Sequence, residues 1–220
     1  MTQSAAGAAA EHATRRRHDV RERILETASE LFYRHGVRAV GVDLVVEEAG
    51  VAKTSLYRHF KTKDELIAAF LAREDEHFWA TWDRAAERHR DDAARELDAH
   101  LDWIGERIGR PDYRGCPQLN VAAEFPARDH PARKVAVAHK RELRRRLQGI
   151  AARLGVQRSD ELAGQLSLLI NGAFVSSQVL SPGEPTQLLR GTAQALIAMA
   201  GNAQMSRPPG PGHGQTGLHS

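Results

Sequence analysis

The chain has 220 residues, a length that suits one small domain together with one larger domain, and its net charge is only +3. Its single cysteine, Cys116, excludes a disulfide within the chain and fits a reducing cytoplasm. No stretch offers the roughly 18 uninterrupted apolar residues of a membrane span, and the N-terminus lacks the pattern of a secretory signal. We therefore expect a cytoplasmic protein that does not enter a membrane.

The N-terminal residues predict a leader followed by a helix. Residues 1–14 are rich in Ala, Gly, Ser and Thr and have little to bury, so we expect them to be disordered. Asp19 suits an N-cap, and Ile24, Ala28, Leu31 and Phe32 recur at the spacing of one buried helical stripe. A helix is expected from Asp19 to about His35, ended by Gly36.

The stretch VDLVVEEAGVAKTSLYRHFKTK, residues 42–63, predicts a helix-turn-helix around which the chain is organised. Its apolar residues favour a short helix capped by Asp43, followed by a turn at Gly50, which tolerates a positive φ. A second short helix is expected over residues 53–60, with Leu56 and Phe60 four apart on one face.

The outer side of this second helix carries hydrogen-bond donors and one aromatic ring, the groups that read base edges and phosphates. We predict base contacts from Thr54, Ser55 and Tyr57 and phosphate contacts from Lys53, His59 and Lys63. Arg58 lies on the same side. The alternative for Tyr57 is packing against the first helix.

The distribution of charge agrees with a DNA-binding N-terminal part. Residues 15–63 hold 11 Lys/Arg and 7 Asp/Glu, a charge of +4, whereas residues 64–220 hold 20 of each. The run Arg15-Arg16-Arg17 is either a solvated segment or an arm that lies along phosphates or in a minor groove.

The rest of the chain predicts helices separated by Gly and Pro. Thr62 is expected to cap a long helix over 63–89, whose N-terminus suits a phosphate and which continues into the next domain. Further helices are expected over 92–108, from Pro117, over 132–154, from Ser159 or Asp160 to 180, and over 186–200. The predicted fold is all-α with about nine helices: a helix-turn-helix domain over 15–63, a helical domain over 64–202 and a disordered tail over 203–220.

The helix-turn-helix stretch resembles the DNA-binding signature of the tetracycline-repressor (TetR) family of bacterial regulators. The matching residues are Ala49-Gly50-Val51, Lys53, Ser55-Leu56-Tyr57-Arg58-His59-Phe60 and Lys61-Thr62-Lys63-Asp64-Glu65-Leu66. The resemblance covers roughly residues 20–70. The chain departs from the family at Val42 and Ala52, where many members carry Thr and Ser that contact phosphate.

The resemblance implies a homodimer formed through residues 160–200, whose two recognition helices enter successive major grooves of a palindromic operator. It also implies a small-molecule effector that binds the C-terminal domain and rotates the helix over 63–89. The expected function is a ligand-responsive transcriptional regulator, a repressor that the effector releases from DNA. The alternative is a constitutive or architectural DNA-binding protein without a ligand, which predicts no polar-lined cavity.

Candidates for the effector site lie on helices that could surround a cavity: Trp82, Trp103, Cys116, Phe125, His139, Asn171, Phe174 and Gln178. For the aromatic residues, ordinary core packing is the alternative. Asn171 and Gln178 are favoured because polar side chains within an apolar helix need partners. Cys116 is either a redox-sensitive thiol at a helix N-terminus beside Arg114 or a small buried residue.

Catalytic and metal-binding patterns are not found. The sequence has no Ser/His/Asp grouping, phosphate loop or metal-ligand spacing, so we expect no enzyme activity, no cofactor and no metal. The basic run of Lys140, Arg141, Arg144 and Arg145 is either a solvated helix face or a second nucleic-acid site.

Overall fold

The computed structural model describes residues 3–177, 179–181 and 183–205, and over these residues the chain forms nine helices and no strand. The helices are α1 (Gln3–His35), α2 (Val42–Glu48), α3 (Lys53–His59), α4 (Lys63–Arg88), α5 (Ala93–Ile108), α6 (Pro117–Glu124), α7 (Pro131–Arg153), α8 (Ser159–Ser176) and α9 (Glu184–Met205). The predicted all-α fold is confirmed. Gln178 and the tail over 206–220 lie outside the described residues.

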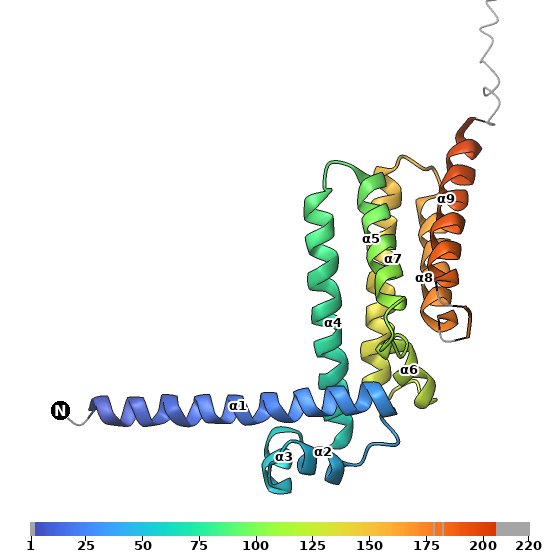
Figure 1. Cartoon of the computed structure of the whole chain (residues 1–220). Coiled ribbons are helices and arrows are strands. Elements are labelled where there is room, and N and C mark those ends of the chain that lie inside the picture. The colour runs from blue at the N-terminus through green and yellow to red at the C-terminus, as the bar shows by residue number, and fades with distance from the viewer. Residues whose placement is uncertain (1–2, 178, 182, 206–220) are drawn as a thin grey trace, which may run out of the picture.

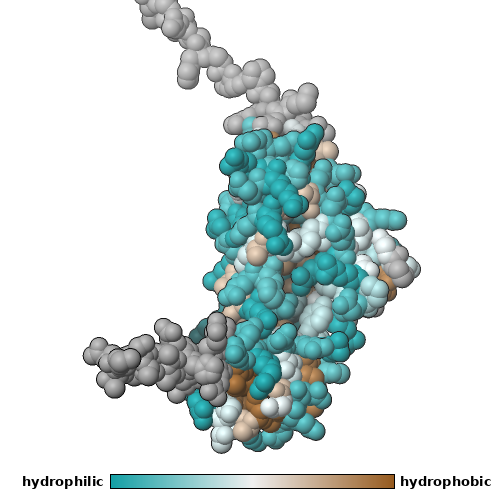
Figure 2. Space-filling model, turned by 60° about the vertical axis from the view of Figure 1, so that its left-hand side comes forward, coloured by the Kyte–Doolittle hydropathy of each residue, from teal (hydrophilic) through white to brown (hydrophobic). Residues whose placement is uncertain are grey.

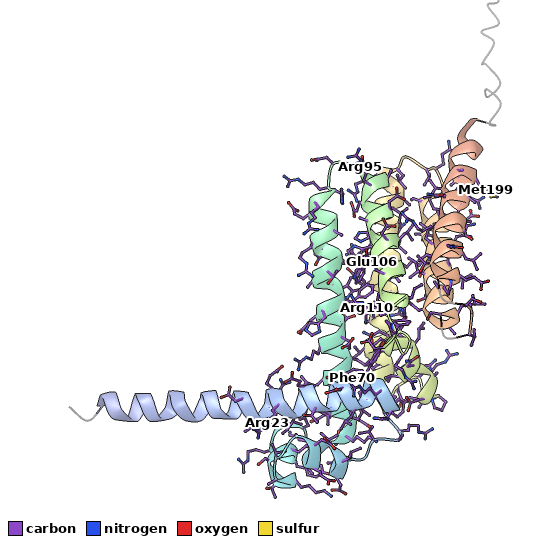
Figure 3. All side chains as sticks on the ribbon, viewed as in Figure 1. Arg23, Phe70, Arg95, Glu106, Arg110 and Met199 are labelled. Carbon is purple, nitrogen blue, oxygen red and sulfur yellow. The ribbon has the colours of Figure 1, made fainter. Side chains whose placement is uncertain are left out.

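The helices form a small lower unit and an upright bundle (Figure 1). In this view α1 lies across the lower end of the molecule, with α2 and α3 beneath it, and α4 rises past it into the bundle of α5, α7, α8 and α9. Phe70 lies where α4 passes α1 (Figure 3), and its ring centroid is 5.8 Å from that of Phe32. Helix α4 therefore connects the two parts mechanically.

Several predicted helix starts are confirmed by their caps. The Thr62 hydroxyl accepts a hydrogen bond from the Glu65 N–H at 3.1 Å, and the Asp92 carboxylate accepts one from the Arg95 N–H at 3.0 Å. Both bonds satisfy backbone donors that the first turn leaves free. Pro117 occupies the first position of α6, where its missing N–H costs nothing.

Other predicted boundaries are wrong. Helix α1 begins at Gln3, so Asp19 is no N-cap, and residues 3–14 are helical instead of disordered; alanine, which is abundant there, is the strongest helix former. Helix α2 is preceded by Gly41 without a side-chain cap, and Asp43 lies in its first turn.

The last two helices also differ from their predicted ranges. Helix α8 follows Arg158, without a side-chain cap, and ends at Ser176. The Ser177 hydroxyl donates to the Phe174 carbonyl at 3.3 Å, a local bond that competes with continuation of the helix. Helix α9 runs over Glu184–Met205, beyond both predicted ends.

The buried apolar residues form two cores. The lower core combines residues of α1 to α3 with the first turns of α4, up to Leu71, and also takes in Val121 of α6 and Ala132 of α7. The upper core joins α4, from Phe78 onward, with α5, α7, α8 and α9. Because α4 contributes to both cores, the domain boundary at residue 63 stays a prediction.

The surface is largely hydrophilic on the face that Figure 2 shows, and larger hydrophobic areas gather at its lower end, the level of α2 and α3. Among the described helices, none combines the length and apolar composition needed to cross a bilayer.

Candidate nucleic-acid interface and effector cavity

Helix α3 is anchored by its apolar face and presents its polar face outward. Leu56 is fully buried and Phe60 is 3% exposed, while Gly50 turns the chain between α2 and α3 with φ of 60°. Tyr57 is 43% exposed, so it is not a core residue. Thr54 and Arg58 are also exposed, and Ser55 and His59 are half-buried. The arrangement leaves a convex polar helix face of the kind that enters a major groove.

Lys53, predicted at a phosphate, is paired within the protein. Its ammonium lies 2.6 Å from a carboxylate oxygen of Asp43 on α2. This hydrogen bond raises the pKa of Lys53, so the side chain keeps its positive charge. Both side chains are exposed, and surface ion pairs of this kind contribute little free energy. A phosphate would have to compete with Asp43 for this lysine.

Lys63, the other lysine predicted at a phosphate, is half-buried at the start of α4. Partial burial lowers its pKa, against the attraction of the Glu124 carboxylate. The first turn of α4 already carries Asp64 and Glu65, and Glu65 accepts a hydrogen bond from the Lys61 N–H at 2.7 Å. These carboxylates occupy the helix terminus that was predicted to hold a phosphate.

Two side chains, Tyr33 and Glu124, join the lower unit to the segment around α6 through four long-range hydrogen bonds. The Tyr33 hydroxyl accepts from the Arg114 N–H at 2.9 Å and donates to the Gly115 carbonyl at 3.3 Å. The Glu124 carboxylate accepts from the N–H groups of Val37 and Arg38 at 3.2 and 2.8 Å. Any displacement of α6 therefore pulls on the end of α1 and on the loop before α2.

A small cavity of about 10 Å³ lies behind these contacts, among α4, α5, α6, α7 and α8. It is lined by Glu74, Phe78, Arg107, Cys116, Pro117, Gln118, His139 and Phe174. Three of the predicted effector residues, Cys116, His139 and Phe174, thus meet at one place. Its volume is at the lower limit for a single water molecule.

The other predicted effector residues do not line this cavity. Trp82 and Trp103 pack against Phe78, with ring centroids 6.2 and 4.8 Å from it. Phe125 stacks on His130 at 3.8 Å and packs against the lower core. Asn171 is partly exposed, and its buried side-chain oxygen has no hydrogen-bond partner among the described residues. For Trp82, Trp103 and Phe125, core packing explains their burial.

Sequence reasoning missed the cavity residues Glu74, Phe78, Arg107 and Gln118. Glu74 and Arg107 form an ion pair at 3.6 Å, and the Gln118 side chain reaches the Leu71 carbonyl of α4. Gln118 could be recognised in the sequence only as a polar residue directly after Pro117 at the start of a helix. Polar residues are common at that position, so this one could not be singled out. The other three lie within ordinary amphipathic helices.

The thiol of Cys116 is buried, with 7% of the residue exposed, and the neighbour that the structure places on it is Lys140. The Lys140 ammonium lies 3.4 Å from the sulfur and 5.1 Å from the centre of the Phe174 ring. The burial agrees with the interpretation of Cys116 as a small buried residue, whereas the neighbouring ammonium is a feature of the redox-sensitive alternative.

Two basic side chains of the run on α7, Arg144 and Arg145, are matched by carboxylates. Arg144 pairs with Asp160 at 3.0 Å and Arg145 with Glu142 at 2.6 Å. This pairing favours a solvated helix face over a second nucleic-acid site. Within the described part of the chain, no three His, Cys, Asp or Glu side chains converge as metal ligands would.

Comparison with known proteins gives one consistent result. Residues 24–70 match the family model described as bacterial regulatory proteins, tetR family. A solved TetR-family transcriptional regulator from Streptomyces coelicolor is 28% identical and superposes with a TM-score of 0.80 over 83% of this chain and 96% of that one.

A second solved structure, a TetR-type transcriptional regulator from Streptomyces avermitilis, is 34% identical, with a TM-score of 0.71 over 83% of this chain and 98% of that one. The HTH-type transcriptional activator FasR of Mycolicibacterium smegmatis is 44% identical over 57 residues. That match spans only 26% of each chain, so it concerns about a quarter of the activator's length.

Proposed function

Because the chain belongs to the TetR family of transcriptional regulators, we propose that it is a ligand-responsive repressor that a small molecule releases from a palindromic operator. As a member of this family it is a DNA-binding regulator and not an enzyme. The observation that carries the ligand-responsive part is the small cavity beside α6, because α6 is hydrogen-bonded to the loop between α1 and α2. The protein would act in the cytoplasm, where its operator lies.

The DNA contacts follow from the exposed face of α3. Thr54, Ser55 and Tyr57 would meet base edges or a thymine methyl, while Lys53 and His59 would meet phosphates. Arg58 is exposed on the same helix and adds positive charge. The half-burial of Lys63 supports a phosphate contact there less well than the exposure of the others.

A homodimer through residues 160–200 is supported by apolar side chains on the outer faces of α8 and α9. Leu168 is 76% exposed, Val175 60%, Leu188 52% and Met199 70%. Met199 projects from the upper part of α9 (Figure 3). So many exposed large apolar side chains on two neighbouring helices indicate a surface that another chain covers. A two-fold dimer would place its two α3 helices on a palindromic site.

Release from DNA would follow if the dimer has a second form, in which the two α3 helices lie too far apart for successive major grooves. The effector would have to bind this form better than the DNA-binding form. A preference of about 3 kcal/mol changes operator affinity roughly a hundredfold. The small volume of the cavity, about 10 Å³, supports this scheme, since any molecule larger than water must push α4 to α8 apart. Movement of α4 or α6 then reaches the recognition helix directly.

The main alternative is a constitutive or architectural DNA-binding protein, which predicts no polar-lined cavity. The Gln118 oxygen and His139 Nε2, which have no hydrogen-bond partner among the described residues, support the ligand-responsive proposal instead. The direction of regulation is a separate question. The similarity to the activator FasR covers only about a quarter of that protein, so it does not decide the direction of regulation. We propose repression because it requires only that the bound protein blocks transcription and that the effector releases it.

A gel-shift assay with the intergenic DNA beside the protein's own gene tests the proposal. We expect a salt-sensitive shift that survives an excess of unrelated duplex. Binding that the unrelated duplex abolishes would contradict an operator in that fragment and favour the architectural alternative. Genome-wide binding would then distinguish a distant operator from non-specific coverage.

A further inference from the structure

The cavity beside α6 presents an unused hydrogen-bond acceptor from Gln118. This side chain is 2% exposed, and its amide nitrogen donates to the Leu71 carbonyl at 3.4 Å. Since the carbonyl can only accept, the contact fixes the orientation of the amide. The Gln118 side-chain oxygen has no hydrogen-bond partner among the described residues. A buried acceptor left in this state costs stability unless a ligand or water supplies a donor.

His139 presents a second acceptor. Its Nδ1 contacts the Asp75 carboxylate, which only accepts, so Nδ1 carries the proton. Burial lowers the pKa of His139, although Asp75 opposes the shift, so the ring is neutral near pH 7. In a neutral ring with Nδ1 protonated, Nε2 is an acceptor. This buried Nε2 has no partner within the described part of the chain.

The remaining wall of the cavity is aromatic. Phe78 and Phe174 line it, and the rings of Phe78 and His139 lie edge to face at 4.8 Å. Faces and edges of this kind accommodate a further aromatic ring by offset stacking or edge contact. All three tryptophans of the chain lie near Phe78 or its neighbours, so occupancy of the cavity should change their fluorescence.

An ion pair lies between the cavity and an outer groove. Glu74 and Arg107 line the inner cavity and also an outer groove of about 230 Å³, which includes Tyr33, Arg110 and Tyr113. The two side chains are 24% and 22% exposed and lie 3.6 Å apart. Figure 3 shows Arg110 just beyond the lower end of α5, where it lines this groove. Opening of this pair would widen the passage between the groove and the cavity.

The free polar atoms of the cavity disfavour an anionic ligand. Both atoms are acceptors, and Arg107 is already paired with Glu74. Lys140 brings a positive charge to this wall, but its ammonium lies against the Cys116 sulfur and the centre of the Phe174 ring, at 3.4 and 5.1 Å. An anion would have to displace Glu74 and would face two lone pairs. A neutral molecule that donates hydrogen bonds meets no such penalty.

We propose that the effector is a small neutral aromatic molecule with at least two hydrogen-bond donors, of the phenol or aromatic amine type. It enters from the outer groove through the Glu74–Arg107 pair and donates to the Gln118 oxygen and to His139 Nε2. This inference rests on the proposed function, since it names the chemistry of the effector that the function requires.

The test compares three probes on the purified full chain: catechol, its dimethyl ether veratrole, and benzoate. Catechol supplies a ring and two donors, veratrole the same ring without donors, and benzoate a ring with an anionic group. Binding is measured by calorimetry and tryptophan fluorescence. We expect catechol to bind at millimolar concentration or below, at least tenfold more tightly than either other probe, since each lost donor leaves a buried acceptor unpaired. Equal or tighter binding of veratrole or benzoate, or no binding of catechol, overturns the proposal.

A variant localises the binding. Gln118→Met keeps the length of the side chain but removes the acceptor, and we expect it to weaken catechol binding about tenfold. Gln148→Met makes the same change on the exposed face of α7 and should leave catechol binding unchanged. Thermal melting of both variants shows whether Gln118→Met still folds. A folded Gln118→Met protein with unchanged catechol affinity would overturn the assignment.

A gel shift with and without catechol separates this inference from the proposed function. If the protein binds DNA specifically but catechol does not bind, the effector class is wrong and the regulatory function stands. If catechol binds with the expected preference but no operator complex forms, the site chemistry stands and the regulatory function fails.

Discussion

The Glu124 carboxylate at the end of α6 lies 2.8 Å from the backbone N–H of Arg38, in the loop between α1 and α2. A second bond, from the Val37 N–H at 3.2 Å, completes a two-point clamp between the bundle and the DNA-binding unit. Hydrogen bonds to an ionised carboxylate are stronger than those between neutral groups. The clamp gives α6 direct control over the position of α2.

Removal of this clamp should lower the stability of the protein and weaken the coupling between the effector cavity and the DNA-binding helices. We expect Glu124→Ala to lower the free energy of unfolding by about 1–3 kcal/mol, because two backbone donors lose a charged acceptor. Effector-induced release from DNA should also weaken. Chemical denaturation and gel shifts measure the two effects. Asp129→Ala, an exposed carboxylate in the next loop, is the control. Unchanged stability and induction in Glu124→Ala would show that the clamp is incidental.

Tyr57 should matter for DNA binding and little for folding. Its 43% exposure places most of the ring outside the core, so Tyr57→Ala should change stability by less than about 0.5 kcal/mol. Operator affinity should fall tenfold or more, since a specific base contact contributes about 1–3 kcal/mol. Leu56→Ala, one residue away and fully buried, should instead lose about 2–5 kcal/mol of stability. A large drop in the melting temperature of Tyr57→Ala would contradict its role as a DNA contact.

The Lys53–Asp43 pair predicts opposite effects for its two members. Lys53→Ala should weaken binding to all DNA sequences alike and reduce the slope of log affinity against log salt by about 0.9, the value for one phosphate contact. Asp43→Asn should strengthen DNA binding, because it frees the ammonium and removes a negative charge near the phosphates. Salt titrations of operator binding measure both. An unchanged salt slope in Lys53→Ala would mean that the lysine only pairs with Asp43 of α2 and contacts no phosphate.

Much of the fold could be predicted because it depends on local patterns. The stripe of Leu66, Phe70, Phe78 and Trp82 repeats at helical spacing, and all four are buried in α4. The recognition helix could be predicted for the same reason, since its signature is continuous in sequence. Local rules failed where a side chain found a different partner. The sequence predicts Asp43 as the cap of α2, but it pairs with Lys53 and caps no helix.

The cavity could not be predicted in this way, because its walls come from five helices. Glu74 and Arg107 meet only once α4 and α5 are packed, and each alone resembles any solvated charge on a helix. The orientation of the Gln118 amide is set by its hydrogen bond to the Leu71 carbonyl, which lies on another helix. Long-range pairings of this kind are properties of the assembled tertiary structure, and periodicity along the chain does not encode them.

The apolar surface of α8 and α9 predicts the oligomeric state. Leu168 is 76% exposed, and a charge at the centre of a dimer interface cannot be hydrated. We expect Leu168→Glu to give a monomer in sedimentation velocity and to lose operator binding, with its helical content unchanged. Val137→Glu changes a 39% exposed residue on α7 and should remain dimeric. A dimeric Leu168→Glu protein would place the interface elsewhere.

His100 should make the protein less stable in mild acid. Its ring is fully buried, stacks on Trp82 at 3.7 Å and lies near Glu96, whose carboxylate is already matched by Arg153. Burial, reinforced by the positive charge of Arg146, lowers the pKa of His100 from 6.5 to about 4. Between these values the unfolded chain binds a proton that the folded chain does not, so folding stability must fall as the pH drops.

The loss should approach roughly 3 kcal/mol between pH 6.5 and pH 4, at 1.36 kcal/mol for each unit of pKa difference. His100→Phe keeps a ring on Trp82 and removes the titrating group, so its stability should fall less over this range than that of the wild-type protein. Urea denaturation at several pH values measures the difference. The shift at His139 remains in both proteins and cancels. His77→Phe, at an exposed position of α4, should keep the wild-type pH profile. If His100→Phe loses stability in acid as steeply as the wild-type protein does, His100 must already be protonated in the folded state, held there by Glu96.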